Sequence, residues 1–254
     1  MDRLGCIVAV EGPSGAGKTT VVRAAARAFG WHPLPEAFDR IDPPPSLRFR
    51  TPAELLSLER TLLAEEGRRY REAVEGRRRG RTVVADTGFL GPLTYTAGLV
   101  ELGDAAPRVL EALRSLVEGR ERPLRVGLPD GIVYLDVPGR VRRWRTARDP
   151  RGHSPEFRER HEAVGRLERR FYRRLARGAL SGRVRFVSGT GAPETVASRV
   201  RAAFHSLEMR GGAPPDLEGA LALLGGGEGR RPTHRRRPSA ATVMKPARSC
   251  RPPR

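Results

Sequence analysis

Lysine is almost absent from this sequence. Of its 254 residues 48 are lysine or arginine, and only Lys18 and Lys245 are lysines. Because arginine replaces lysine nearly everywhere, the net charge of +19 is only a weak indication of binding to nucleic acid or to an acidic membrane surface. A position that keeps lysine against this bias is a candidate for a role that arginine cannot perform.

Cysteine and long apolar runs are also scarce. Cys6 and Cys250 lie at opposite ends of the chain, so no disulfide framework is indicated and a reducing compartment is expected. The first residues lead into an apolar strand without a signal-type leader, and Leu221–Leu224 is too short to cross a bilayer. We therefore expect a cytoplasmic protein that does not bind membranes. His153 and His161 are predicted to be exposed, and neither lies near enough other ligands to suggest zinc.

Short β-branched runs alternate with longer helical patterns, which predicts an α/β fold with a parallel sheet covered on both faces. The predicted strands are Cys6–Val10, Trp31–Pro35, Thr82–Ala85, Ile132–Leu135 and Val184–Val187. Predicted helices begin at Gly17 and after an N-cap at Thr51, and others cover Leu90–Ala112 with a break near Gly103, Gly139–Thr146, Ser154–Leu180 and Pro193–Leu207.

The character of the chain changes after Glu208. Residues 209–254 are rich in glycine, proline and arginine and carry +7 of the net charge. Such a composition buries too little apolar surface to order itself. We predict one domain over residues 1–208 and a disordered, dispensable basic tail over residues 209–254, the one segment for which nucleic acid binding is considered.

A phosphate-binding loop explains the unusual lysine. The sequence G-x-x-x-x-G-K-[ST] is matched at every fixed position, between an apolar strand and a helical pattern. Its glycines let successive N–H groups point at phosphates, and the following helix adds its positive dipole end. Lysine reaches the β- and γ-phosphates as a compact cation, and the threonine after it offers a hydroxyl to Mg²⁺. The residues predicted to bind ATP are Gly12, Pro13, Ser14, Gly15, Ala16, Gly17, Lys18, Thr19 and Thr20.

The loop and several later blocks resemble one kinase family. Glu11–Thr20 is similar to the loop of thymidylate kinases, within the wider thymidylate and deoxynucleoside kinase family. Weaker blocks follow in the same order, at Pro35-Glu36-Ala37, Val83–Asp86, Leu93-Thr94-Tyr95, Tyr134–Pro138 and Ser188–Ala197. The resemblance covers about residues 4–208. It implies a three-layer P-loop kinase fold with about five parallel strands and an arginine lid, and transfer of the γ-phosphoryl of ATP, with Mg²⁺, to a nucleoside or nucleotide.

Three departures from the family pattern leave the acceptor open. Ser14 stands where thymidylate kinases usually carry Asp, Ala37 follows Glu36 where Pro is usual, and Thr87 follows Asp86 where an acceptor-binding Arg is usual. One alternative is a kinase of a non-nucleotide acceptor such as an antibiotic or metabolite. Another is an ATP-binding regulatory protein with weak ATPase activity, which is disfavoured because no Glu follows Asp86 or Asp136 to activate water.

Two carboxylates are predicted to take part in the chemistry. Asp86 ends a buried strand and should emerge beside the phosphate-binding loop, where the resemblance assigns it, with Thr19, to the metal or to the acceptor. Glu36 follows the second strand into the same crevice, and in the deoxynucleoside kinase branch the matching Glu acts on the acceptor hydroxyl. Asp136 ends another strand and is a weaker candidate, since a strand-end Asp often caps the next turn.

Arginines that could close over the transferring phosphoryl group cluster after the fourth predicted strand. Their spacing favours Arg145 and Arg148 as catalytic lid residues, and Pro150 and Gly152 then break the helix as expected for a moving lid. The other members of the cluster are Arg142, Arg143 and Arg151.

The acceptor is predicted to be a small molecule. The aromatic residues predicted to line its pocket, each with a role in the core as the alternative, are Phe38, Tyr70, Phe89 and Tyr95. Arg68 and Arg69 lie where relatives place an acceptor-binding arginine, but the register does not assign that role to either. Whether the chain forms a homodimer is left open.

Overall fold

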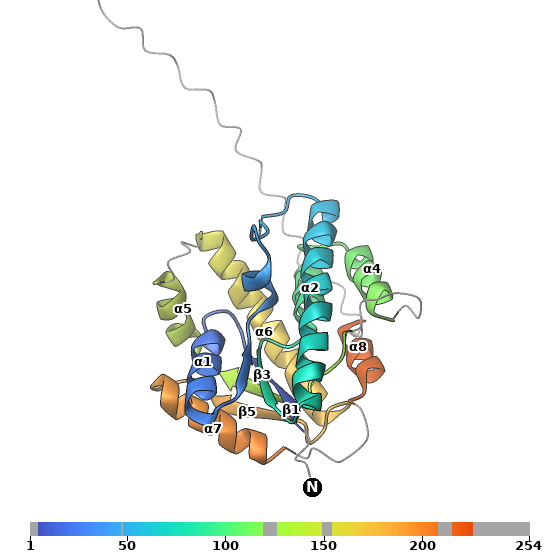
Figure 1. Cartoon of the computed structure of the whole chain (residues 1–254). Coiled ribbons are helices and arrows are strands. Elements are labelled where there is room, and N and C mark those ends of the chain that lie inside the picture. The colour runs from blue at the N-terminus through green and yellow to red at the C-terminus, as the bar shows by residue number, and fades with distance from the viewer. Residues whose placement is uncertain (1–4, 47, 119–125, 149–153, 208–214, 226–254) are drawn as a thin grey trace, which may run out of the picture.

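The five predicted strands form one parallel sheet. The computed structural model describes residues 5–46, 48–118, 126–148, 154–207 and 215–225 (Figure 1). The strands are β1 (Cys6–Glu11), β2 (His32–Leu34), β3 (Thr82–Asp86), β4 (Gly131–Asp136) and β5 (Val184–Ser188). Their order in the sheet is β2-β3-β1-β4-β5, and every neighbouring pair is parallel. The predicted fold class is confirmed, and each predicted strand lies within one or two residues of the observed one.

Strand residues alternate between two hydrophobic cores, because successive side chains of a strand point to opposite faces. In β1, Ile7 and Ala9 belong to the core on one face and Val8 and Val10 to the core on the other. All four are fully buried, so both faces of the central strand are covered. This is the reason that β1 reads as a continuous apolar run in the sequence.

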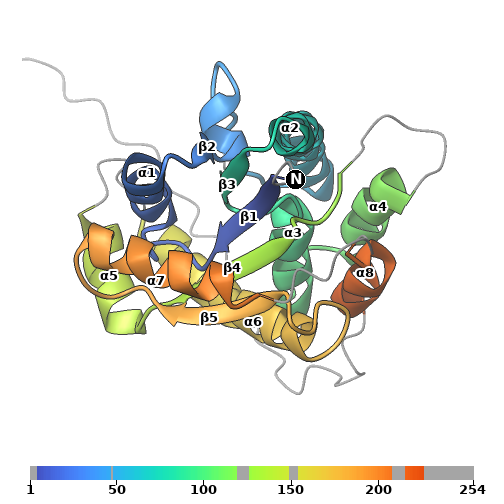
Figure 2. The same ribbon diagram turned by 60° about the horizontal axis from the view of Figure 1, so that its bottom comes forward.

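Helices cover both faces of the sheet (Figure 2). Helices α1 (Lys18–Phe29) and α7 (Pro193–His205) pack on each other over one face. The larger core on the other face lies under α2 (Pro52–Arg78), α3 (Gly91–Leu102), α4 (Pro107–Glu118) and α6 (Pro155–Arg177). A short helix, α5 (Gly139–Ala147), follows β4, and a 3₁₀ turn, η1 (Ala37–Arg40), follows β2. Among the described residues, no helix combines the length and the hydropathy needed to cross a bilayer.

Local signals set the helix boundaries. The Thr51 hydroxyl caps α2 by accepting a hydrogen bond from the Glu54 N–H at 3.1 Å, and Ser154 caps α6 in the same way at Phe157. Gly103 ends α3 in the left-handed conformation that glycine adopts without strain, which accounts for the predicted break. These caps depend only on neighbouring residues, so the sequence could predict them.

The strand order places a crevice at one edge of the sheet. The central strand β1 has β3 on one side and β4 on the other, and the chain enters α1 directly after β1. At such a switch point the loops that leave neighbouring strands diverge, and ligands bind outside the carboxyl ends of the strands. The phosphate-binding loop is the connection between β1 and α1.

The predicted disordered tail contains a folded helix, which corrects the predicted boundary at Glu208. Helix α8 (Leu217–Gly225) packs against α6 and α3, and its Ala220 and Leu221 are buried. A short apolar segment such as this one orders through tertiary contacts and has too little intrinsic helicity to be recognised alone. Residues 226–254 lie outside the described residues.

Replacing Leu221 by Ala should lower the free energy of unfolding by about 2 kcal/mol or more, because Leu221 is only 2% exposed and its removal leaves a cavity. Urea denaturation followed by circular dichroism measures this. Ala222→Ser, at the exposed neighbouring position, is the matched control. Equal urea midpoints for the two variants and the wild type would show that α8 adds nothing to the stability of the fold.

Candidate functional site

The phosphate-binding loop forms one wall of a cleft of about 990 Å³. Gly12 and Gly17 have backbone φ angles of 146° and 90°, which residues that carry a Cβ rarely adopt. A Cβ on Gly12 would also lie 2.9 Å from the Leu135 carbonyl oxygen. The Lys18 ammonium group folds back and donates to the Gly12 carbonyl oxygen at 2.8 Å. The loop therefore has the backbone conformation that the motif predicted.

Lys18 is surrounded by carboxylates. Burial by itself would lower the pKa of Lys18, yet its pKa is raised above the ordinary value because four acidic side chains stabilise the ammonium form. In order of effect they belong to Glu36, Glu168, Asp86 and Glu11. The cation that the sequence singled out is thus the centre of a charged cluster.

Glu11, the last residue of β1, was not among the predicted site residues. It is 1% exposed, and its Oε1 accepts hydrogen bonds from the Gly88 N–H and the Tyr172 hydroxyl, both at 2.6 Å. Its Oε2 is buried without a partner, and burial raises the pKa of the carboxyl. Glu11 thereby joins the start of the loop to the segment after β3 and to α6. The signal in the sequence was a charged residue that ends an otherwise apolar strand.

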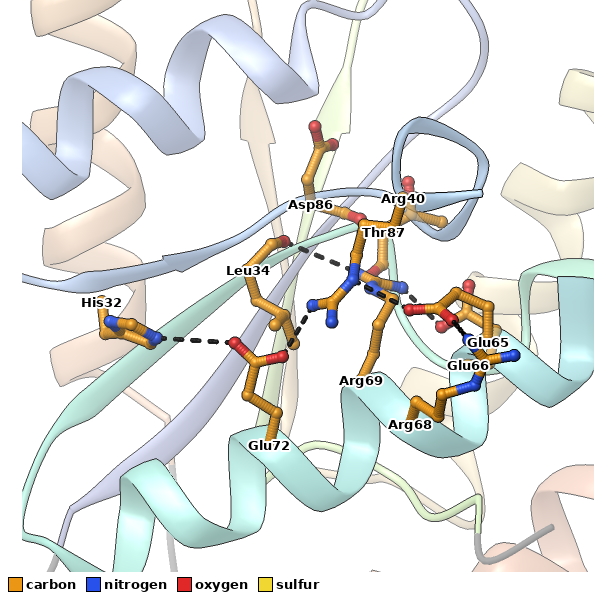
Figure 3. A network of polar contacts seen from close by, with 10 residues as sticks. All are labelled: His32, Leu34, Arg40, Glu65, Glu66, Arg68, Arg69, Glu72, Asp86 and Thr87. Atoms are coloured by element: carbon orange, nitrogen blue, oxygen red, sulfur yellow. Dashed lines mark hydrogen bonds and ion pairs between the residues drawn. The ribbon is translucent and has the colours of Figure 1, made fainter. Parts of the chain in front are cut away.

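Glu36 lies in the cleft, where the sequence placed it. It directly precedes η1, and Arg40 at the end of η1 forms ion pairs with Glu65 and Glu72 of α2 at 2.8 and 2.7 Å. Figure 3 shows this connection between η1 and α2. Burial raises the pKa of Glu36, and the nearby Lys18 partly opposes that effect. A carboxylate with a raised pKa is a better base near neutral pH than an exposed one.

Asp86 also reaches the cluster around Lys18, from the end of β3. It is 1% exposed, and its Oδ1 is buried without a hydrogen-bond partner. The next residue, Thr87, lines the cleft with a φ of 68°. A β-branched residue in this left-handed region is strained by about 1–3 kcal/mol and is held there only by its surroundings. Strain of this kind is concentrated at functional sites.

Arg69 is the residue that holds these strand ends (Figure 3). Its guanidinium group is fully buried and donates to the Asp86 and Thr87 carbonyl oxygens at 2.8 and 3.2 Å. It also pairs with Glu66 one turn earlier on α2. Burial raises the pKa of Glu66 to about 8, and the charge of Arg69 works against that rise. Arg69 is therefore a positioning residue, while Arg68 is largely exposed and pairs with Glu65.

Glu168 is a site residue that the sequence analysis missed. It comes from α6, lines the cleft, and is the second strongest carboxylate neighbour of Lys18. Burial raises its pKa to about 7, although Lys18 lowers it. It lies in an arginine-rich helix whose rotation about its axis the sequence does not define, so no local signal distinguished it from its exposed neighbours.

The two predicted lid arginines line the cleft from α5 and the residue after it. Arg145 donates to the Ala16 carbonyl oxygen at 2.7 Å and to the Gly189 carbonyl oxygen at 3.1 Å, so it connects the phosphate-binding loop to the turn after β5. Arg148 lies 4.1 Å from the centre of the Trp144 ring. Arg151, also named in the predicted cluster, lies outside the described residues.

The remaining predictions divide between the cleft and other regions. Phe38 and Tyr95 line the cleft, whereas Tyr70 and Phe89 pack on each other in the core. His161 was predicted to be exposed, but it is half-buried and lines the cleft, because α6 turns this face toward α3.

Asp136 lies apart from this cleft. It pairs with Arg169 and lines a separate cavity of about 620 Å³. The structure therefore does not bring Asp136 to Lys18 in the way that it brings Asp86.

The oxygen donors of the cleft are of the kind that Mg²⁺ prefers. Asp86 has an orphaned buried oxygen, and Thr19 lines the same cleft. Among the described residues, no group of three or more His, Cys, Asp or Glu side chains forms a metal cage. Mg²⁺ in phosphate-binding sites takes few protein ligands and completes its shell with phosphate and water oxygens, so this donor set fits that ion.

Replacing Arg69 by Ala should lower the free energy of unfolding by about 3–5 kcal/mol, because it leaves the Glu66 carboxyl and the strand-end carbonyls without their buried partner. Arg68→Ala, at the adjacent exposed position, should cost less than about 1 kcal/mol. Urea denaturation at neutral pH compares the two. Similar losses in both variants would contradict the assignment of Arg69 as the residue that holds the strand ends.

Comparison with known proteins agrees with this geometry. A family model described as an AAA domain matches residues 7–122, which include the phosphate-binding loop and Asp86. No curated protein matches the chain.

Solved structures of a deoxyadenosine kinase from M. mycoides resemble the chain at low sequence identity. The form with the products dCMP and a flexible dCDP bound is 15% identical with a TM-score of 0.60, and the form with bound dATP is 15% identical with a TM-score of 0.59. Each match covers 79% of this chain and 99% of the other. The predicted resemblance is thus confirmed at the level of the fold: the chain is a P-loop protein with a deoxynucleoside kinase-like architecture.

Proposed function

We propose that this protein transfers the γ-phosphoryl group of ATP to a hydroxyl group of a nucleoside or nucleotide. The observation that carries the proposal is the gathering of the Glu36 and Asp86 carboxylates around Lys18, beside a cleft that Lys18 and Glu36 line. The same cleft extends to residues of α2, α3 and α6, among them Glu59, Tyr95 and His161. Phosphoryl transfer depends mainly on positioning and on neutralising charge, which such a site can supply.

Each residue then has a distinct role. Lys18 exchanges its bond to the Gly12 carbonyl for the β- and γ-phosphate oxygens, where its charge stabilises the transition state. Glu36 takes the proton of the acceptor hydroxyl, a role favoured by its raised pKa. Thr19 and Asp86 would hold Mg²⁺, which when bound neutralises charge on the phosphates.

The arginines and Glu168 complete the site. Arg145 already contacts the phosphate-binding loop, so a small movement of its guanidinium group brings it to a bound phosphate. Arg148 lies at the same rim of the cleft. Glu168 shares the charge of Lys18 in the absence of nucleotide, and its pKa near 7 lets it take up a proton when phosphates displace it.

The similar solved structures support a nucleoside-type acceptor. The matched M. mycoides structures have dCMP and dCDP, or dATP, bound, and these molecules carry cytosine or adenine. 2′-Deoxyadenosine and 2′-deoxycytidine are therefore the first acceptors to test, with thymidine and its monophosphate beside them. Thr87, which stands where the family's acceptor-binding arginine is usual, keeps a non-nucleotide hydroxyl compound as the second candidate.

Lys18→Ala should reduce kcat for phosphoryl transfer by at least about 10²-fold, because it removes the ammonium group that balances the transferring phosphates. Transfer of the terminal phosphate from radiolabelled ATP measures this. Arg27→Ala, on the exposed side of α1, is the matched control for loss of a positive charge. Circular dichroism shows whether both variants are folded, and near-normal transfer by folded Lys18→Ala would contradict the proposal.

An acceptor screen separates the alternatives. Labelled phosphate that appears on a nucleoside or nucleotide supports the proposal. Transfer only to another hydroxyl compound would replace the acceptor class but keep the kinase. Release of labelled phosphate to water, stimulated by DNA or RNA and by no small molecule, would favour the ATP-binding regulatory protein instead.

A further inference from the structure

The cleft also contains a buried acid that the proposed function does not use. Glu59, on α2, is 2% exposed and lines the cleft, and its Oε2 has no hydrogen-bond partner. Burial raises the pKa of Glu59 to about 8. Glu66, seven residues later, is buried to a similar extent but is paired with Arg69. Burial thus favours the neutral carboxylic acid form of Glu59, whose Oε2 is left without a hydrogen-bond partner.

Aromatic rings flank this acid. The His161 ring stacks on Tyr95 at a centroid distance of 5.3 Å and contacts Phe157 at 3.9 Å, and all three residues line the cleft. Phe49 lines it as well. Flat apolar surfaces beside one polar group suit a planar heterocycle, whose faces pack on the rings while one edge forms hydrogen bonds.

The protonation state of a carboxyl group determines which hydrogen-bonding edge of a heterocyclic base it can pair with. A protonated carboxyl group presents one O–H donor and one C=O acceptor side by side, whereas an ionised carboxylate presents two acceptors. A carboxamide could also present a donor beside an acceptor, but the chain contains no Asn and no Gln. Among the described residues that line the cleft, Glu59 is the acidic side chain that combines burial with an orphaned oxygen.

We propose that Glu59 determines acceptor specificity through its protonation state, an inference that rests on the proposed function. In its neutral form it can pair with a ring nitrogen beside an exocyclic amino group, as in adenine and cytosine, and also with a ring N–H beside a carbonyl, as in guanine and thymine. In its ionised form it offers two acceptors and pairs only with two adjacent N–H donors, the edge of guanine. The cleft should therefore accept adenine-type acceptors at neutral pH and lose them, but not guanine-type acceptors, as pH rises.

Several titratable and charged groups surround Glu59. Tyr95 comes from α3, and burial raises its pKa to about 12, so it stays neutral throughout the range of interest. Arg160 and His161 come from α6, Glu66 from α2 itself, and Asp104 follows α3 and pairs with Arg160. Because Glu66 also titrates in this range, the test compares the wild type with a variant at Glu59 alone.

The test measures kcat/KM for 2′-deoxyadenosine and 2′-deoxyguanosine, two purines of similar size, at about pH 6.5 and about pH 8.5. In the wild type, kcat/KM for 2′-deoxyadenosine divided by kcat/KM for 2′-deoxyguanosine should fall by about fourfold or more between the two pH values, because most of Glu59 ionises over that range and the ionised form does not pair with adenine. In Glu59→Gln, which has the shape of the neutral acid but cannot ionise, the ratio should change far less. Glu75→Gln, on the exposed side of α2, should behave as the wild type.

A second measurement needs no acceptor. The folded state keeps the Glu59 proton up to about pH 8, whereas the unfolded chain releases it near pH 4.5, so this group makes stability fall as pH rises between those values. Glu59→Gln should lose less stability than the wild type over that range. Identical pH dependence in the two proteins would show that Glu59 is not held neutral.

The possible failures are distinguishable. If the wild type phosphorylates a nucleoside, but its ratio of kcat/KM for the two purine nucleosides changes with pH no more than the ratio of Glu59→Gln does, the role proposed for Glu59 is wrong. The proposed function then still stands. If neither purine nor any other nucleoside or nucleotide accepts phosphate, the proposed function fails and this inference fails with it.

Discussion

The structure depends on the electrostatic balance around Lys18. Burying an ammonium group costs free energy unless opposite charges accompany it, and here four carboxylates do so. With all of them ionised the cluster is net negative, so a bound triphosphate needs either protons or a divalent cation to enter. The raised pKa values of Glu11, Glu36 and Glu168 show that burial already favours the protonated forms. Under the proposed function, the same arrangement would let protons or Mg²⁺ balance the charge of an incoming nucleotide.

The scaffold around the cluster explains how it is kept in place. Glu36, Asp86 and Glu11 come from the carboxyl ends of three neighbouring strands, where parallel strands bring their last residues together. Arg69 contacts two of these ends: it donates to the Asp86 and Thr87 carbonyl oxygens after β3 and, at 3.5 Å, to the Leu34 carbonyl oxygen that ends β2. The bond to Thr87 stabilises its left-handed conformation. A buried arginine on a helix that is remote in sequence thus supports a strained residue at the site.

Sequence reasoning succeeded where local patterns determine the structure. The apolar strands, the Thr51 cap and the phosphate-binding loop depend on neighbouring residues, and all three form as predicted. The structure brings Glu36 and Asp86 to Lys18 because strand ends converge, which the order of strands and helices already implied. Their roles in the chemistry stay predictions.

Sequence reasoning was insufficient where the outcome depends on tertiary packing. Glu168 and Glu59 lie on long helices, and only the rotation of each helix decides which of its acidic residues reach the cleft. For Tyr70 the sequence left both an acceptor-site role and a core role open, since helical spacing does not distinguish those two faces, and the structure packs Tyr70 on Phe89 in the core. Helix α8 could not be predicted from the sequence for a similar reason, because its apolar residues become ordered only through their contacts with α3 and α6.

The central claim is that the loop after β1, with Lys18 at its end, binds a magnesium-complexed nucleotide. Isothermal titration calorimetry of the folded protein with ATP, in the presence of Mg²⁺ and again with the ion chelated, tests it directly. The account predicts saturable binding of one ATP per chain with Mg²⁺ and clearly weaker binding without it, because the carboxylates around Lys18 repel an uncompensated triphosphate. Absence of binding to well-folded protein under both conditions would contradict the account.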